Sequence, residues 1–393
     1  MEETNEKTIE KTNKKINIFT EIISGILISI VLIPETIAYS YILKVPPEMG
    51  FRSAISMGLV TSLFGTPTLI SGATAAVATS LLGVVKNHGI EYISFTVILG
   101  GILQLLFGIT GLYKLLINVP NSINSGFLLA LAVLIGTSQF ENLKDKNKNF
   151  YDSNKICNIL LFTILGLFII QYGYIMLRRF NTEIRIPGSV LEIFLISLFL
   201  YITPIDIPKI EKLEKLDLSK SLIDTSIFKN MTIEKIIMLL PYAFAMSFAG
   251  LFESIVMVKK TNTNNYWNET MVQGVANIIS GLTGGMGGCV LVGESLLNIN
   301  NGSNTRIAAL VVVTLLLLIN LFFMDIVNKI SISSIIAIML YICYLTGDWK
   351  ELINPKGNTS LTMLITAITG IYTNSLTAGV VTGYLFNYLS SLI

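Results

Sequence analysis

Long apolar stretches, almost free of charge, recur along the whole of this 393-residue chain. A transmembrane helix needs about 20 mostly apolar residues, and twelve stretches reach or approach that length. Only 13% of the residues are charged, against about 25% in a typical soluble domain. So little charge cannot provide a surface that suits water, so we predict an all-α polytopic membrane protein. The stretches run about 18–43, 51–70, 91–113, 120–140, 155–177, 186–204, 235–258, 269–283, 305–325, 330–347, 357–372 and 374–392.

Two further apolar stretches, about 74–86 and 287–299, are too short to cross a bilayer alone. Runs of small residues lead into both, and the short stretch stands third among seven segments in each half of the chain. Because seven is odd, the second half enters the membrane inverted relative to the first. About fourteen segments in a seven-plus-seven inverted repeat result. Matching interruptions in inverted halves indicate a transport site near the membrane midplane, although two re-entrant packing elements would give the same pattern.

Polar stretches set the expected domain boundaries and topology. Residues 1–17 form a tail, 18–204 the first inverted repeat, 205–234 a connector and 235–393 the second inverted repeat. Four lysines between Lys7 and Lys15 place the N-terminal tail in the cytoplasm. The connector is then extracellular or periplasmic, and the C-terminus is cytoplasmic. The tail lacks the apolar region of a signal peptide, so we expect a multi-pass protein of the plasma or inner membrane.

The composition disfavours several classes of function. A formal net charge of +2 does not indicate the strongly basic surface that binds nucleic acid. The three cysteines lie in apolar stretches, as packing residues do, and do not form the pattern of a disulfide framework or a metal site. The sequence contains a single histidine, no cluster of metal ligands and no nucleophile–base pair. We therefore expect neither an enzyme nor a resident cofactor.

The starts of the two short helices are the candidate binding site. A helix that begins inside the membrane leaves its first N–H groups to face protein or a polar cavity. Two facing starts supply about one positive charge without Lys or Arg, which suits a small monovalent anion. The hydroxyl of Thr74 either donates to that anion or caps its helix. Candidate substrate-binding residues are Ala73, Thr74, Ala75, Gly288 and Cys289, with Tyr39 facing either the same cavity or lipid.

Acidic residues inside apolar segments are further candidates, because charge is costly in a membrane. Glu35 precedes Thr74 by 39 residues and Glu253 precedes Cys289 by 36, so each half has a carboxyl at a similar offset. A carboxylate about 5 Å from an anion repels it by about 3 kcal/mol at an effective dielectric of about 20. We predict that Glu253 binds Na⁺ or H⁺ and so links cation and anion binding. A protonated Glu253 that bonds only a backbone carbonyl is the alternative.

Two more glutamates are interpreted more modestly. Glu192 is expected at a membrane boundary, as an interface residue. Glu294 is expected two turns into the second short helix, where it either serves the site or hydrogen-bonds a neighbouring helix.

Several motifs occur in order along the chain. They are Leu32 to Tyr39, Val45 to Gly50, Ser71 to Ala76, Gly250 to Ser254, Gln273 to Asn277, and Gly284 to Cys289 followed by Asn298 and Arg306. Over about residues 18–350 this pattern resembles the SulP family of inorganic anion transporters, the sulfate permease type. The stretch from His88 to Tyr92 is similar in particular to the bicarbonate-transporting branch.

The resemblance implies core and gate bundles, elevator-like alternating access and a homodimer in a lipid bilayer. It implies an anion held between the short helix starts, by Thr74 in the first half and by Gly287, Gly288 and Cys289 in the second. The chain stops before the cytoplasmic STAS domain that most of the family carries, so we expect none.

In the bicarbonate branch, a carboxylate at the position of Glu253 and a threonine one turn later help to hold Na⁺. The threonine position here is Met257, which supplies no hard oxygen ligand. The candidates for cation or proton coupling are therefore Glu253, Gly287 and Glu35, with Glu253 the candidate Na⁺ ligand.

The leading hypothesis is secondary active transport of a small inorganic anion, with bicarbonate favoured and sulfate next. Sulfate carries two negative charges, so it needs more compensating positive charge than two helix starts supply. The alternatives are a proton-coupled nucleobase transporter of the same architecture and an anion channel.

Overall fold

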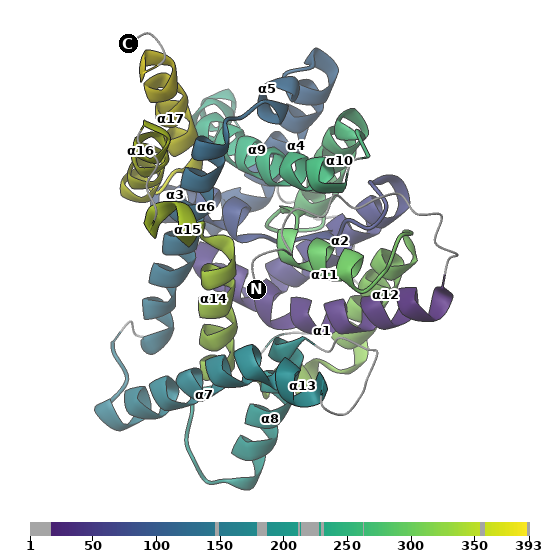
Figure 1. The fold of residues 1–393 in the computed structure, drawn as a ribbon, viewed down its shortest axis with the longest axis vertical. Helices are drawn as coiled ribbons and strands as arrows, with labels where there is room; N and C mark the ends of the chain where they lie inside the picture. The colour runs from purple at the N-terminus through teal and green to yellow at the C-terminus, as the bar shows by residue number, and fades with distance from the viewer. Residues whose placement is uncertain are drawn as a thin grey trace.

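The computed structural model describes residues 17–145, 149–178, 187–210, 213, 228, 232–261, 263–353 and 358–390. Most of them are helical, as predicted (Figure 1). The first half contains α1 (Ile18–Leu43), α2 (Pro47–Phe64), β1 (Ser71–Gly72), α3 (Ala75–Asn87), η1 (Ile90–Tyr92), α4 (Ile93–Thr110), α5 (Lys114–Ile117), α6 (Asn121–Ser138), η2 (Gln139–Leu143), α7 (Ser153–Arg178) and α8 (Gly188–Ile202). The second half contains α9 (Ile233–Thr261), α10 (Tyr266–Leu282), β2 (Cys289–Val290), α11 (Val292–Asn300), α12 (Ile307–Phe322), α13 (Met324–Val327), α14 (Ile332–Thr346), α15 (Trp349–Ile353), α16 (Asn358–Thr373) and α17 (Leu376–Ser390).

The two halves share an order of elements. Each begins with two helices, continues through a two-residue strand into a short helix, and then has a longer helix and a four-residue helix before the remaining helices. The four-residue helices α5 and α13 occupy equivalent places. This correspondence agrees with a duplicated architecture.

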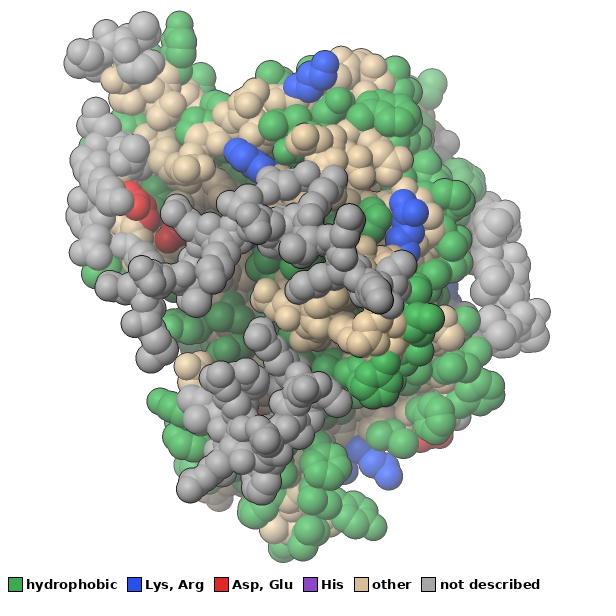
Figure 2. Space-filling view, turned by 45° about the vertical axis from the view of Figure 1, so that its right-hand side comes forward, with side chains coloured by type: hydrophobic (Ala, Val, Ile, Leu, Met, Phe, Trp, Pro, Cys, Tyr) green, Lys and Arg blue, Asp and Glu red, His purple; other side chains and the backbone are tan. Residues whose placement is uncertain are grey.

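The described helices have the length and surface of a membrane protein. Five spans are long and apolar enough to cross a bilayer, and five shorter apolar helices accompany them. The outward face of α7 carries Leu161, Ile164 and Phe168, whose exposed fractions are 60%, 66% and 58%. Figure 2 shows hydrophobic side chains over much of the described surface on one face, with isolated Lys and Arg between them. Such a surface suits lipid, so the chain is a helical membrane protein.

The helices form two groups. Helices α1 to α4 pack with α9 to α12, and we call this group the core bundle. Helices α6 to α8 pack with α14, α16 and α17, and we call this group the gate bundle. In Figure 1, α7, α8 and α14 lie together at the lower left, and α1, α11 and α12 lie to the right. Within the core bundle, α4 and α10 pack backbone to backbone, because a Cβ added to Gly101 would lie 2.6 Å from the carbonyl oxygen of Gly274.

A two-stranded antiparallel pair joins the halves at the centre of the core bundle. Ser71 of β1 pairs with Val290 of β2, and Gly72 pairs with Cys289. The first short helix begins at Ala75, one residue from the predicted start. The second begins at Val292, five residues after the predicted start, because the residues before it are taken up by the strand pairing.

Candidate anion site

The strand pair positions the starts of α3 and α11. Because the strands are antiparallel, the helices leave the pair in opposite directions and both present their N-terminal ends to it. The N-cap residues are Thr74 for α3 and Leu291 for α11, and neither side chain accepts a hydrogen bond from its own helix. Neither N-cap side chain therefore caps its helix, although in α11 the Glu294 carboxyl reaches its own backbone N–H.

A chain of buried polar side chains crosses this strand pair. The thiol of Cys289 donates a hydrogen bond to Oε2 of Glu253 over 2.9 Å. The hydroxyl of Thr74 lies 3.1 Å from Sγ of Cys289, and it is the donor there because a thiol has one proton to give. These contacts bring α3, β2 and α9 together. Three residues that the sequence singled out separately thus meet in one place.

A second polar group lies beside the first. The hydroxyl of Tyr39 donates to Oε2 of Glu35 over 3.5 Å, a long contact. The carboxyls of Glu35 and Glu294 are within hydrogen-bonding reach of each other. Tyr39 is also close enough to Glu253 and Cys289 to interact with them electrostatically. The two groups therefore form one cluster.

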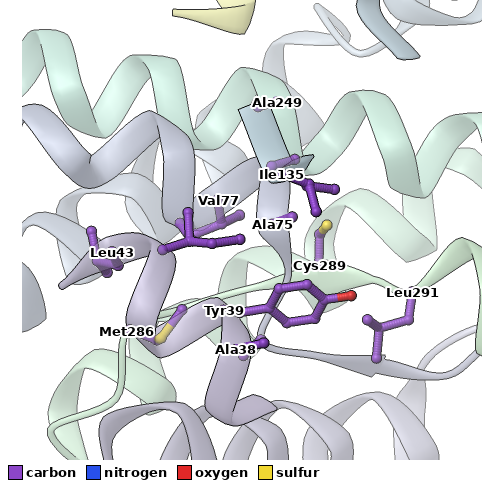
Figure 3. Close-up of a cluster of buried hydrophobic side chains, with 14 of the residues drawn as sticks. Ala38, Tyr39, Leu43, Ala75, Val77, Ile135, Ala249, Met286, Cys289 and Leu291 are labelled. Atoms are coloured by element: carbon purple, nitrogen blue, oxygen red, sulfur yellow. The ribbon is translucent and has the colours of Figure 1, made fainter. Parts of the chain in front are cut away.

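The remaining predicted lining residues are buried in the large hydrophobic core that contains Tyr39 and Cys289. Ala73 and Ala75 are 1% and 5% exposed, and Tyr39 is 5% exposed. Figure 3 draws Tyr39 from α1, Ala75 from α3 and Cys289 from β2 together in this core. The small side chains of the two alanines add little bulk at the start of α3.

Three buried carboxyl groups in one cluster constrain its charge. Glu35, Glu253 and Glu294 are 3%, 8% and 7% exposed. Two carboxylates about 4 Å apart repel by about 4 kcal/mol at an effective dielectric of about 20, so ionising both Glu35 and Glu294 is costly. Glu294 is the third residue of α11, in its first turn, where its carboxyl opposes the positive helix end. It was expected two turns in, and the later helix start explains the difference.

The predicted glycines before α11 hold the strand pair together. Gly287 has a φ of +73°, a conformation that favours glycine. A Cβ on Gly288 would lie 1.8 Å from the carbonyl oxygen of Gly72. The N–H of Gly288 donates to Oδ1 of Asn277 over 2.9 Å, and the N–H of Gly287 donates to the hydroxyl of Ser280 over 3.3 Å. Both N–H groups are thus bonded within the protein, so direct binding by them stays a prediction.

One face of α10 supports the strand pair. The motif from Gln273 to Asn277 was named in the sequence analysis, but this role was not assigned to it. Gln273 donates to Oε1 of Glu269 over 2.8 Å and to the hydroxyl of Ser71 over 2.9 Å. Asn277 donates to the carbonyl of Gly288 over 3.0 Å. The spacing of four residues between Glu269, Gln273 and Asn277 puts them on one helix face, and this signal was visible in the sequence.

Glu192 lies in the gate bundle, in the second turn of α8. Its side chain is fully buried, and no hydrogen bond of normal geometry reaches either carboxyl oxygen, although Ser334 lies nearby. A Cβ on Gly166 of α7 would lie 2.9 Å from Oε1 of Glu192, which shows how closely α7 covers it. The side chain points toward neighbouring helices, and its expected place near a membrane boundary stays a prediction.

The fold and the site define a helical membrane protein in which two short helix starts and three buried carboxyl groups meet. A model of the sulfate permease family matches residues 18–369, and the chain belongs to that family. Members of the family are membrane transporters of anions and not enzymes.

Relatives of both transport types resemble the chain. It is 30% identical over 382 residues to the protein named "Putative sulfate transporter YbaR" of Bacillus subtilis, covering 94% of this chain and 76% of that protein. It is 23% identical over 381 residues to the bicarbonate transporter BicA of a Picosynechococcus strain, covering 87% of this chain and 65% of BicA.

Two solved structures share the fold. The transmembrane domain of a cyanobacterium bicarbonate transporter BicA superposes with a TM-score of 0.76 at 20% identity, covering 92% of this chain and 97% of that one. The structure of SLC26A9 also superposes with a TM-score of 0.76, at 13% identity, covering 95% of this chain and 65% of that one.

Proposed function

We propose that the chain is a secondary active transporter of a small inorganic anion, which binds at the start of α3 beside Thr74 and Cys289. The observation that carries the proposal is the strand pair, which brings the starts of α3 and α11 to one buried cluster and leaves the α3 start without a side-chain cap or an acidic residue. Uncapped N–H groups and the positive helix end favour a small anion there. The family membership supports the same class of substrate.

The coupling ion we propose is H⁺. Ionised carboxylates of Glu35, Glu253 and Glu294 would each repel an anion in the cluster by several kcal/mol, so protons must neutralise them when the anion binds. The contact between Glu35 and Glu294 is a natural place for a shared proton. A proton and an anion would then enter and leave together.

Na⁺ is the weaker candidate. The Glu253 carboxyl accepts from the thiol of Cys289, and sulfur is a poor ligand for a hard cation. Met257, one turn later, is buried and also offers only sulfur. Among the described residues no cluster of three or more His, Cys, Asp or Glu has a metal-site arrangement.

Bicarbonate is the favoured substrate and sulfate the second. Both kinds of transporter occur among the relatives. The charge argument favours the monovalent anion, because a dianion needs one more proton or cation for the same net charge in the cluster. We further propose fourteen membrane segments as a seven-plus-seven inverted repeat, with both termini in the cytoplasm, and a homodimer whose core bundle moves against the gate bundle.

Transport by the purified protein in liposomes tests this proposal. Labelled bicarbonate and labelled sulfate are supplied outside at fixed pH, while the interior pH or the Na⁺ gradient is varied. We expect uptake of at least one anion, accelerated by an alkaline interior and insensitive to Na⁺. Uptake of uracil without either anion would favour the nucleobase alternative, and conductance far above transporter turnover would favour a channel; both results contradict the proposal.

A further inference from the structure

A groove lies between the two bundles, at the end of the molecule where α1 stops, and none of the cluster's polar side chains lines it. Its volume is ≈ 210 Å³. The core bundle contributes Ile42 and Lys44 of the α1 end and one face of α3, and the gate bundle contributes Leu134 and Thr137 of α6. The groove therefore follows the boundary between the parts that we propose to move.

One stripe of α3 leads along this groove toward the anion cluster. Thr79, Leu82 and Lys86 line it, at the spacing that places residues on one helix face. The hydroxyl of Thr79 donates to the carbonyl of Ala75 over 2.9 Å, one helical turn back. The groove therefore runs from a lysine at the far end of α3 to within about one turn, roughly 5 Å, of the helix start.

A second cavity of ≈ 550 Å³ continues the groove outward, since Tyr41, Lys44 and Glu141 line both. We call the two cavities together the vestibule. Among the described residues, its charged lining consists of Lys44, Lys86, Lys144, Lys209, Glu141 and Asp145. Four ammonium groups against two carboxylates leave the wall two charges positive.

The ion pairs in the vestibule do not cancel this excess. The carboxyl of Glu141 is shared, because it lies 3.9 Å from Nζ of Lys44 and 3.4 Å from Nζ of Lys144. The Lys44 and Glu141 side chains are about half exposed. One carboxylate between two ammonium groups leaves a positive potential that water reaches.

We propose that the vestibule is a recruitment site for small inorganic anions, in which Lys44 and Lys86 attract the anion before it passes along α3. This rests on the proposed function and deepens it, and under the proposed topology the vestibule opens outside the cell. A unit charge about 8 Å from the anion in water changes its local concentration about two- to threefold, and salt screens that effect.

Transport kinetics give the first test. The anion that the unaltered protein transports is used as the probe at roughly 0.01 M and 0.3 M ionic strength. Lys44→Gln and Lys86→Gln each raise the external KM about two- to threefold at low salt with kcat unchanged, and Glu141→Gln lowers it. Lys329→Gln is the matched control, because Lys329 is an exposed lysine outside the residues that line either cavity. A merely structural ion pair would make Lys44→Gln and Glu141→Gln act in the same direction, and that result overturns the proposal.

A labelling experiment tests the vestibule without transport. Thr137→Cys places a thiol in the groove, and the modification of position 137 by membrane-impermeant anionic and cationic thiol reagents is followed by mass spectrometry. The ratio of the anionic to the cationic rate falls about two- to threefold with Lys44→Gln or Lys86→Gln and rises with Glu141→Gln. If the unaltered protein transports neither anion, the proposed function fails while this ratio still measures the vestibule. A ratio that these variants leave unchanged contradicts the recruitment site.

Discussion

The starts of α3 and α11 lie on one strand pair, yet they differ in charge. The first turn of α3 contains no acidic residue, whereas that of α11 contains Glu294. A carboxylate in the first turn, when ionised, offsets the positive helix end. Under our proposal, α3 keeps its positive end for the anion, and Glu294 of α11 shares a proton with Glu35. A fold with two similar halves can in this way divide anion binding and proton binding between them.

The glycines that precede the two helices differ in how closely the backbone packs against them. The largest expected effect follows from this difference. Gly288→Ala should prevent folding or cost several kcal/mol, because its Cβ would lie 1.8 Å from the backbone oxygen of Gly72. Gly72→Ala is the matched change, and its Cβ first meets the flexible Cδ1 of Leu291 at 3.3 Å. The yield of monodisperse protein and its unfolding temperature in detergent measure both. Equal tolerance of the two alanines would mean that the strands do not pair as described.

The second effect concerns the charge of the α3 start. Ala75→Asp gives α3 an acid in its first turn, as α11 has. At about 5 Å and an effective dielectric of about 20, the added repulsion is about 3 kcal/mol, so anion uptake should fall by about a hundredfold or more. Ala75→Asn has the same size without the charge and should lose far less. If the two variants transport equally, the anion does not bind at this helix start.

The third effect concerns the polar chain across the strand pair. Cys289→Ala removes the donor to Glu253 and the acceptor for Thr74, which costs about 1–3 kcal/mol in a buried site. We expect uptake to fall by about tenfold to a hundredfold. Cys289→Ser keeps a donor and an acceptor and should retain most of the activity. Alanine and serine variants of equal activity would show that the chain does not contribute.

The smallest effect is at the start of α11. A Cβ on Gly293 would meet nothing within 4 Å, so Gly293→Ala should stabilise the helix by about 0.5–1 kcal/mol and leave uptake within about twofold. Thermal unfolding and uptake are measured on the same preparation. A stabilised protein with strongly reduced uptake would place the anion against α11 as well and remove the proposed asymmetry.

The sequence predicted one half of the site more accurately than the other. The start of α3 was predicted within one residue because a run of small residues leads directly into a short apolar stretch there. The start of α11 was placed too early, because Cys289 and Val290 pair with a strand more than 200 residues away and local pattern does not show such pairing. The burial of Glu192 also depends on which helices cover α8. By contrast, the four-residue spacing of Glu269, Gln273 and Asn277 is enough to predict a shared polar helix face, although the sequence analysis did not use it.

The central claim is that protonated carboxyls in the cluster permit anion binding at α3. The dependence of anion uptake on the interior pH tests it most directly. Uptake is measured in liposomes while only the interior pH is changed, so that the external anion concentration stays fixed. Glu294→Gln removes the shared proton, and Glu192→Gln is the control, a buried carboxyl in the gate bundle. We predict that an alkaline interior accelerates uptake by the unaltered protein and by Glu192→Gln, and that Glu294→Gln transports with little response to the gradient. Uptake by the unaltered protein that ignores the pH gradient would contradict the account.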